Sequence, residues 1–234
     1  MEHTASRPAP AGRTRRIVLT ASAVLGLAGA AFVLRRPLTM AVPMCTAGRW
    51  DICFGTLNGV AFLALAALPL AAVAVWVLAR GRRAVDRATA WRLSLAEVGM
   101  VYGSAPWVWI TLQPGAGAGV VPGRLSLVPL RDLLTMGTGG IIGNLLVFAT
   151  LGYFAPVRFA ALASFPRVLA LGAACSVLIE TTQYVLWLDR VSSVDDVLLN
   201  ATGAGLAALA SRHRWRTTVP VPAEQPRPAP ARVA

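Results

Sequence analysis

The stretch VLALGAACSVLIETTQYVLWL, residues 168–188, decides the fold of this chain. It is long and apolar enough to cross the roughly 30 Å hydrocarbon core of a bilayer as one α-helix. Its single charged residue is Glu180. A carboxylate inside a membrane helix costs roughly 2.5–3.5 kcal/mol on insertion scales, so we expect Glu180 to meet a polar partner, a water-filled cavity or a reacting group.

The composition extends this pattern to the whole chain. Of the 234 residues, 56% are hydrophobic and 14% are charged, and the apolar residues lie in long blocks, as in membrane-spanning segments. The net charge of +12 comes from 22 arginines without a lysine. Because these arginines cluster between the apolar blocks, where positive charge sets membrane orientation, we expect membrane lipids and not nucleic acid as partners.

The apolar blocks predict an all-α, multi-pass helix bundle in the cell membrane with about six transmembrane helices. The predicted spans are residues 17–34, 57–79, 91–112, 139–157, 168–188 and 194–210. Their connections are richest in arginine on one side, which places both termini in the cytoplasm. We expect a disordered tail (1–16), three spans (17–112), a second domain with the other three (113–210), and a basic, proline-rich tail (211–234).

Three short segments need separate interpretation. The first span follows Arg15-Arg16, so it is either a retained span or a twin-arginine export signal. Residues 125–134 are too short to span the bilayer and are predicted to lie at its interface or dip into it. Cys45 and Cys53 bracket a short loop, and a disulfide between them is an open possibility if the loop faces an oxidising compartment.

The candidate binding site consists of polar side chains in the last three predicted spans and their final turn. The predicted ligand-binding residues are Asn144, Ser176, Glu180, Gln183, Arg190, Asp195, Asp196 and Asn200. Ser176, Glu180 and Gln183 are spaced i, i+4 and i+7, so they share one helix face. Asp196 and Asn200 are also four residues apart, on a helix that must run antiparallel to the first after so short a turn.

Each of these residues also has a structural interpretation. Asp195 follows Ser192 by three residues, as in a helix-capping box, and Asn200 and Gln183 can join helices by hydrogen bonds. Glu180 and Asp196 are the candidate general acid and base, because a buried carboxyl beside an ionised one can supply both functions. The only two histidines, at positions 3 and 213, lie in polar tails, so we expect no metal site and no cofactor.

Three motifs give the chain a family resemblance. They are Leu127-Val128-Pro129-Leu130; Asn144-Leu145-Leu146-Val147-Phe148 with Gly152; and Ser176-x3-Glu180-x2-Gln183 followed by Arg190 and Asp195-Asp196-Val-Leu-Leu-Asn200-x2-Gly203. On these residues, the segment 125–210 resembles the VanZ-like membrane protein family, whose namesake lowers susceptibility to the glycopeptide teicoplanin. Ser193 stands where that family often carries an acidic residue.

The resemblance implies a protein that acts at the bacterial envelope. We expect its polar site to bind a membrane lipid, a lipid-linked cell-wall precursor or a glycopeptide. Two alternatives remain open: an enzyme that uses Glu180 and Asp196 on a lipid-linked substrate, and a small proton-coupled transporter or scaffold that uses Glu180. A shared fold does not by itself decide among these functions.

Overall fold

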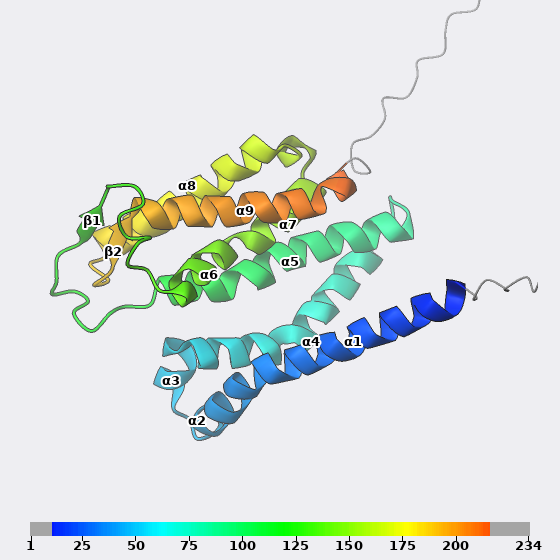
Figure 1. The fold of residues 1–234 in the computed structure, drawn as a ribbon, viewed down its shortest axis with the longest axis horizontal. Helices are drawn as coiled ribbons and strands as arrows, with labels where there is room; N and C mark the ends of the chain where they lie inside the picture. Colours follow the sequence, from blue (N-terminus) through cyan, green and yellow to red (C-terminus); the bar gives the residue numbers. More distant parts are fainter. Residues whose placement is uncertain (1–10, 216–234) are drawn as a thin grey trace, which may run out of the picture. The chain divides into compact units, whose positions relative to one another are not determined.

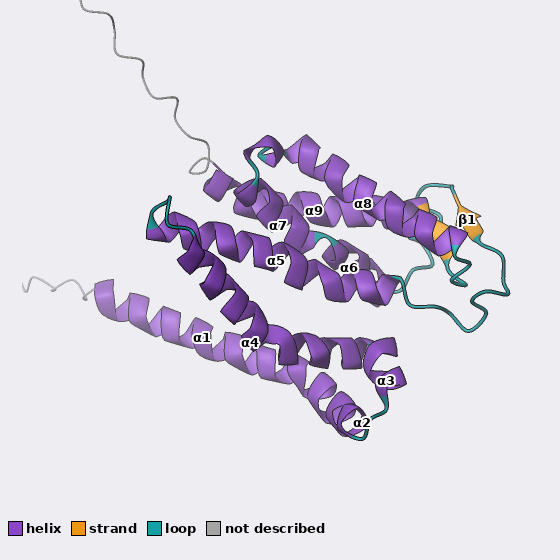
Figure 2. Cartoon of the chain, turned by 180° about the vertical axis from the view of Figure 1, so that it is seen from behind, coloured by secondary structure: helices purple, strands orange, loops and turns teal. Residues whose placement is uncertain are grey.

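The structure, a computed structural model, describes residues 11–215. Helices make up most of this range, with one pair of short strands and a long loop around β1 (Figure 2). The helical fold class is confirmed, whereas the strands were not expected. The chain divides into two compact units, Met1–Ala66 and Ala67–Ala234.

The first unit is built from one long helix and a disulfide-bonded turn. Its elements are α1 (Ala11–Arg36), a π-helical turn η1 (Pro37–Ala41), α2 (Val42–Thr46), α3 (Trp50–Gly55) and the start of α4 (Leu57–Gly81). Helix α1 begins inside the segment 1–16, which was predicted to be a disordered tail; residues 1–10 lie outside the described residues. Cys45 and Cys53 form a disulfide, and both are buried with Ala41 against Phe62 and Leu63.

The second unit is a bundle of helices that run along a similar direction (Figure 1). Its helices are α5 (Arg87–Thr111), α6 (Thr138–Val147), α7 (Ala149–Arg158), α8 (Phe165–Val185) and α9 (Val194–Trp215), with a 3-10 turn η2 (Ala160–Leu162) before α8. Helix α9 packs against α6, α7 and α8, and α5 packs against α7. The core lies along α9, formed by Val147, Phe148, Val168, Ile179, Ala204 and Ala208.

Two glycines allow the helices around α9 to approach closely. A Cβ atom added to Gly203 on α9 would collide with the backbone carbonyl of Leu145 on α6. One added to Gly152 on α7 would collide with the carbonyl of Ala204 on α9. Small residues at helix contacts are typical of membrane bundles, where close backbone packing replaces the hydrophobic effect as the cause of association.

Three predicted spans have different ends in the structure. The fourth is divided into α6 and α7 at Phe148, a buried residue whose backbone leaves the helical region at φ −114° and ψ 15°. The fifth ends at Val185 and not at residue 188, because the chain turns with positive φ at Trp187 (49°) and Asp189 (54°). Helix α9 continues to Trp215, into the segment predicted to be a tail; residues 216–234 lie outside the described residues.

The strands lie at the end of the bundle where α8 stops and α9 starts. Strand β1 (Arg124–Ser126) pairs in parallel with β2 (Val191–Ser193), with Leu125 opposite Ser192. The segment 125–134 is therefore strand and turn, with Leu130 at a positive φ of 65°.

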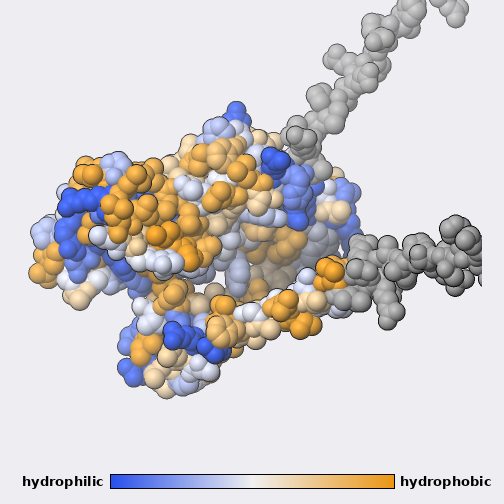
Figure 3. Space-filling model, viewed as in Figure 1, coloured by the Kyte–Doolittle hydropathy of each residue, from blue (hydrophilic) through white to orange (hydrophobic). Residues whose placement is uncertain are grey.

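Among the described residues, four segments are long and apolar enough to cross a membrane. They are Val18–Thr46, Leu57–Gly81, Thr138–Arg158 and Phe165–Val185. Helices α5 and α9 have sufficient length, 25 and 22 residues, but carry more polar side chains. In the second unit, hydrophobic surface covers much of the α8–α9 face, while hydrophilic residues gather at its ends (Figure 3). This distribution fits a membrane protein.

Candidate functional site

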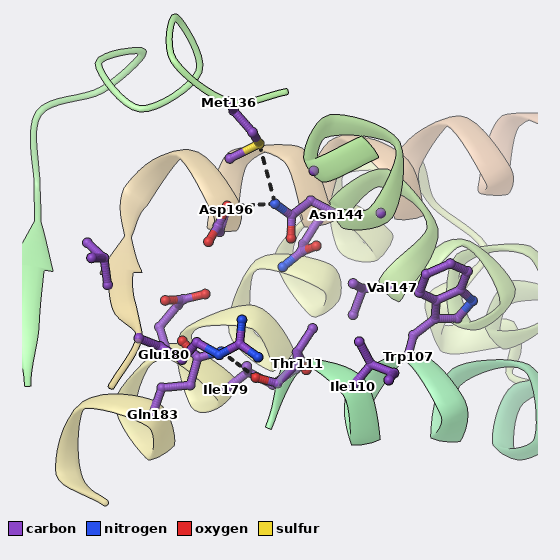
Figure 4. Close-up of a pocket in the computed structure, with 15 residues that line it drawn as sticks. Trp107, Ile110, Thr111, Met136, Asn144, Val147, Ile179, Glu180, Gln183 and Asp196 are labelled. Carbon is purple, nitrogen blue, oxygen red and sulfur yellow. Dashed lines mark hydrogen bonds between the residues drawn. The ribbon is translucent and has the colours of Figure 1, made fainter. Parts of the chain in front are cut away.

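A cavity of about 380 Å³ lies within the second unit, where α5 and α8 end and α6 and α9 begin (Figure 4). Six of the eight predicted ligand-binding residues line it: Asn144, Glu180, Gln183, Arg190, Asp196 and Asn200. The other two, Ser176 and Asp195, do not. Helical spacing and a short turn thus bring most of the predicted set to one place.

Glu180 lies against the chain segment that leaves α8. Its carboxylate oxygen Oε2 accepts a hydrogen bond from the backbone N–H of Ser193 at 3.0 Å. Its backbone carbonyl accepts a second bond, from the Ser192 hydroxyl, at 2.8 Å. Strand β2 therefore covers the last turns of α8, and Glu180, 9% exposed, keeps its carboxylate toward the cavity (Figure 4).

Asp196 and Asn144 face each other across α9 and α6. The Asn144 side-chain amide donates to Asp196 Oδ1 at 2.6 Å. The same amide nitrogen lies 3.8 Å from the sulfur of Met136 (Figure 4). Asn144 thereby fixes the orientation of the Asp196 carboxylate at the cavity wall.

Asn200 is the most deeply buried polar residue of the cavity wall, at 2% exposure. Its amide nitrogen donates to the hydroxyl of Ser176 at 2.7 Å. Ser176 is fully buried and so acts as the partner that orients Asn200. The Asn200 carbonyl oxygen, Oδ1, has no hydrogen-bond partner in the described part of the chain. A buried acceptor without a donor costs about 1–3 kcal/mol.

Helix α5 supplies cavity residues that the sequence did not reveal. Gln183 donates to the backbone carbonyl of Thr111 at 2.9 Å, at the end of α5. Arg190 donates to the carbonyl of Gln113 at 3.2 Å, just beyond that helix. Trp107 and Ile110 of α5 form an apolar side with Val147, apart from the polar groups (Figure 4).

Asp195 is held by backbone hydrogen bonds at the start of α9, and its role in ligand binding stays a prediction. It is 2% exposed, and its two carboxylate oxygens accept bonds from three backbone N–H groups: Leu130 at 2.5 Å, Asp132 at 2.8 Å and Leu133 at 3.0 Å. Asp195 faces the turn after β1 because it is adjacent to Asp196 on α9, and adjacent helical residues point about 100° apart. It anchors this turn to the start of α9.

Ser193 joins the same network. Its hydroxyl accepts the N–H of Asp195 at 3.2 Å, as a helix N-cap does. It also donates to Asp132 Oδ2 at 2.5 Å. Hydrogen bonds from Ser126 and from Ser193 hold the pKa of Asp132, which lies outside the spanning helices, below its usual value.

The cavity combines polar acceptors with an apolar side. Glu180 and Asp196 contribute two carboxylates to its lining, Asn200 contributes an amide side chain, and Arg190 contributes a guanidinium group. Within the range 11–215, no group of three or more His, Cys, Asp or Glu side chains is placed to hold a metal ion. The arrangement can bind a group rich in hydrogen-bond donors, and the two carboxylates can exchange protons with it.

Comparison with curated proteins found no match, and comparison with solved structures found none either. The protein-family model described as VanZ/LLP1 matches residues 98–215, half of the chain. All residues that line the cavity fall within that match. This chain therefore belongs to the VanZ/LLP1 family.

Proposed function

We propose that this membrane protein binds the polar head group of an envelope amphiphile, a lipid or a lipid-linked cell-wall precursor, in the cavity around Glu180. Membership of the family links the chain to glycopeptide resistance. We further propose that head-group binding lowers susceptibility to a glycopeptide such as teicoplanin. The proposed arrangement has six spans, with both termini in the cytoplasm and the cavity toward the outer face.

The excess of hydrogen-bond acceptors carries this proposal. Glu180 and Asp196 each contribute a carboxylate to the cavity lining, and beside them Asn200 Oδ1 is buried without a donor. A ligand that brings hydroxyl, amide or amino donors can form charge-assisted hydrogen bonds with the two carboxylates. Such donors are abundant in the sugars and amines of envelope head groups. Arg190 can pair with a phosphate of the same molecule.

The size and polarity of the cavity favour a head group over a whole antibiotic. Its volume of about 380 Å³ is near the small end of ligand cavities, which span roughly 300–1,000 Å³. It has room for one head group and not for a glycopeptide. The apolar side formed by Trp107, Ile110 and Val147 suits the start of an acyl or prenyl chain.

Glu180→Gln tests the proposal in a strain where deletion of the gene changes teicoplanin susceptibility or envelope lipids. Glutamine can still accept from the Ser193 N–H, so the fold is retained, while the carboxylate becomes an amide with two donors. The matched control is Thr181→Val, because Thr181 is exposed on the same helix. We expect the wild type and the control to restore the phenotype and Glu180→Gln to fail at equal membrane abundance. Full restoration by Glu180→Gln refutes the proposal.

A second candidate is an enzyme, favoured by one observation: Glu180 and Asp196 face one cavity from two helices. One carboxyl would donate a proton and the other accept one during hydrolysis or transfer on the bound lipid. Turnover of a labelled envelope lipid by the purified protein tests this. If the protein binds the lipid but does not turn it over at saturating lipid concentration, the proposal of a head-group site stands and the proposal of an enzyme is excluded.

A further inference from the structure

A second cavity, of about 570 Å³, lies in the second unit between the start of α5 and the ends of α7 and α9. Two arginines line it, Arg92 from α5 and Arg214 from the last turn of α9. None of its lining residues lines the cavity around Glu180. It is therefore a separate site, independent of the proposed function.

The charge around this cavity is strongly positive. Seven arginines lie at the end of α4, in its connection to α5, at the start of α5 and at the ends of α7 and α9: Arg80, Arg82, Arg83, Arg87, Arg158, Arg212 and Arg214. Of the described acidic residues in this region, Asp86 caps the N-terminus of α5 by accepting the Thr89 N–H at 3.0 Å. Glu97 is held by Arg82 and Arg158. Because arginines outnumber these carboxylates, the region as a whole attracts an anion.

The walls of the cavity change from polar to apolar along the helices. Arg92 lies in the second turn of α5, and Leu95, 49% exposed, lies one turn further along that helix. On α7, Tyr153 and Phe154 add aromatic rings, and the Arg214 guanidinium lies 5.8 Å from the Tyr153 ring centre. A cationic end followed by an aromatic and aliphatic wall matches a phosphate head group above its acyl chains.

We propose that this cavity binds an anionic phospholipid, with its phosphate between Arg92 and Arg214 and an acyl chain along Leu95 and Phe154. Guanidinium groups bind phosphate oxygens through paired N–H donors, which makes arginine better suited than a single point charge. Trp91, half-buried in the same wall, is suited to the head-group level of the bilayer. Basic pockets between membrane helices are a known way to hold such head groups.

The test measures lipid binding by the purified full chain in detergent. Short-chain phosphatidylglycerol, phosphatidylcholine and inorganic phosphate are titrated separately, and the rise in unfolding temperature reports binding. We expect phosphatidylglycerol alone to raise that temperature. An equal rise with phosphatidylcholine overturns the preference for an anionic lipid, and an equal rise with inorganic phosphate overturns the assignment to a lipid.

Matched double variants distinguish binding of the lipid in the cavity from a general attraction of the anionic lipid to the positive charge of this region. Arg92→Gln/Arg214→Gln removes both cavity arginines, while Arg83→Gln/Arg87→Gln removes the same charge from exposed positions of the same region. We expect the first pair to weaken phosphatidylglycerol binding at least about tenfold, as loss of charge-assisted hydrogen bonds does. The control should weaken it much less. Equal weakening by both pairs overturns the proposal.

A measurement on the folded wild type keeps the proposal testable if the double variant fails to fold. Brominated phosphatidylglycerol quenches a tryptophan that it touches, so it should quench the protein more than brominated phosphatidylcholine does. The additional quenching by brominated phosphatidylglycerol should disappear in Trp91→Phe, which removes the indole of the cavity wall. Equal quenching by the two lipids in the wild type overturns the proposal.

Discussion

Asp195 and Asp196 are adjacent carboxylates with opposite surroundings, so their amide variants are predicted to separate folding from binding. Asp195 is buried and holds the turn after β1 through three backbone N–H groups. Asp196 lines the cavity and accepts one bond from Asn144. We predict that Asp195→Asn destabilises the fold, whereas Asp196→Asn weakens head-group binding and leaves the fold nearly unchanged.

The magnitudes follow from the number of acceptor oxygens. An asparagine at position 195 has one, and in its better orientation that oxygen serves Asp132 and Leu133 while its amide faces the N–H of Leu130. One buried N–H without an acceptor costs about 1–3 kcal/mol. Asp195→Ala leaves three such groups and costs about 3–5 kcal/mol, since the losses are not additive. At position 196 the amide oxygen still accepts from Asn144, so we expect a change below about 1 kcal/mol.

Thermal unfolding of the purified full chain in detergent measures the first effect. Limited proteolysis of residues 127–136 gives a local readout, because loss of the Asp195 bonds should release this turn first. Titration of the same samples with an envelope lipid measures the predicted loss of head-group binding in Asp196→Asn. Equal losses of stability in Asp195→Asn and Asp196→Asn, or an intact turn in Asp195→Asn, would refute the assignment of the two roles.

Three further predictions concern packing, pH and redox state. Gly203→Ala presses a methyl group on the backbone of α6 and should lower the free energy of unfolding by about 1–3 kcal/mol; Gly139→Ala, which meets open space, should be neutral in the same thermal assay. The pKa of Asp132 is lowered in the folded chain, so its stabilisation is present above the unfolded value of 3.8 and is lost as pH falls through the folded pKa. When the pH is below the folded pKa of Asp132, the amide protection factors of the turn that contains it should therefore decrease. Unchanged protection factors would contradict a stabilising role for the hydrogen bonds of Asp132. Reduction of the Cys45–Cys53 disulfide opens a loop of sequence separation 8 and removes about 2.5 kcal/mol of loop-closure entropy, so trypsin should cut this loop faster after reduction.

Helical periodicity was sufficient to predict the part of the cavity lining that α8 and α9 supply. The spacing from Ser176 to Gln183 fixes one face of α8, and the short connection forces α9 back along it. Asn200 then meets that face, where its amide donates to Ser176. These inferences need local geometry alone, which a single sequence contains.

The remaining features depend on contacts that carry no periodic signal. The bond from Gln183 to Thr111 joins residues 72 positions apart, on α8 and α5, and only the tertiary packing of the bundle brings them together. Which of Asp195 and Asp196 lines the cavity and which holds a turn depends on where the turn after β1 lies. Strands of three residues are too short to show alternation, so the pairing of β1 with β2 was not predictable either.

The position of Glu180 near a helix end explains how the membrane helix tolerates its carboxylate. It lies five residues before the end of α8, about 7.5 Å along the axis, where strand β2 supplies the N–H of Ser193. Irregular backbone at membrane depth persists only where protein covers it or where it lines a polar cavity. Both conditions hold here, because Asp195 fixes the covering turn and Glu180 lines the polar cavity. The chemistry of the site therefore depends on the loop that closes the bundle as much as on the helices that carry its side chains.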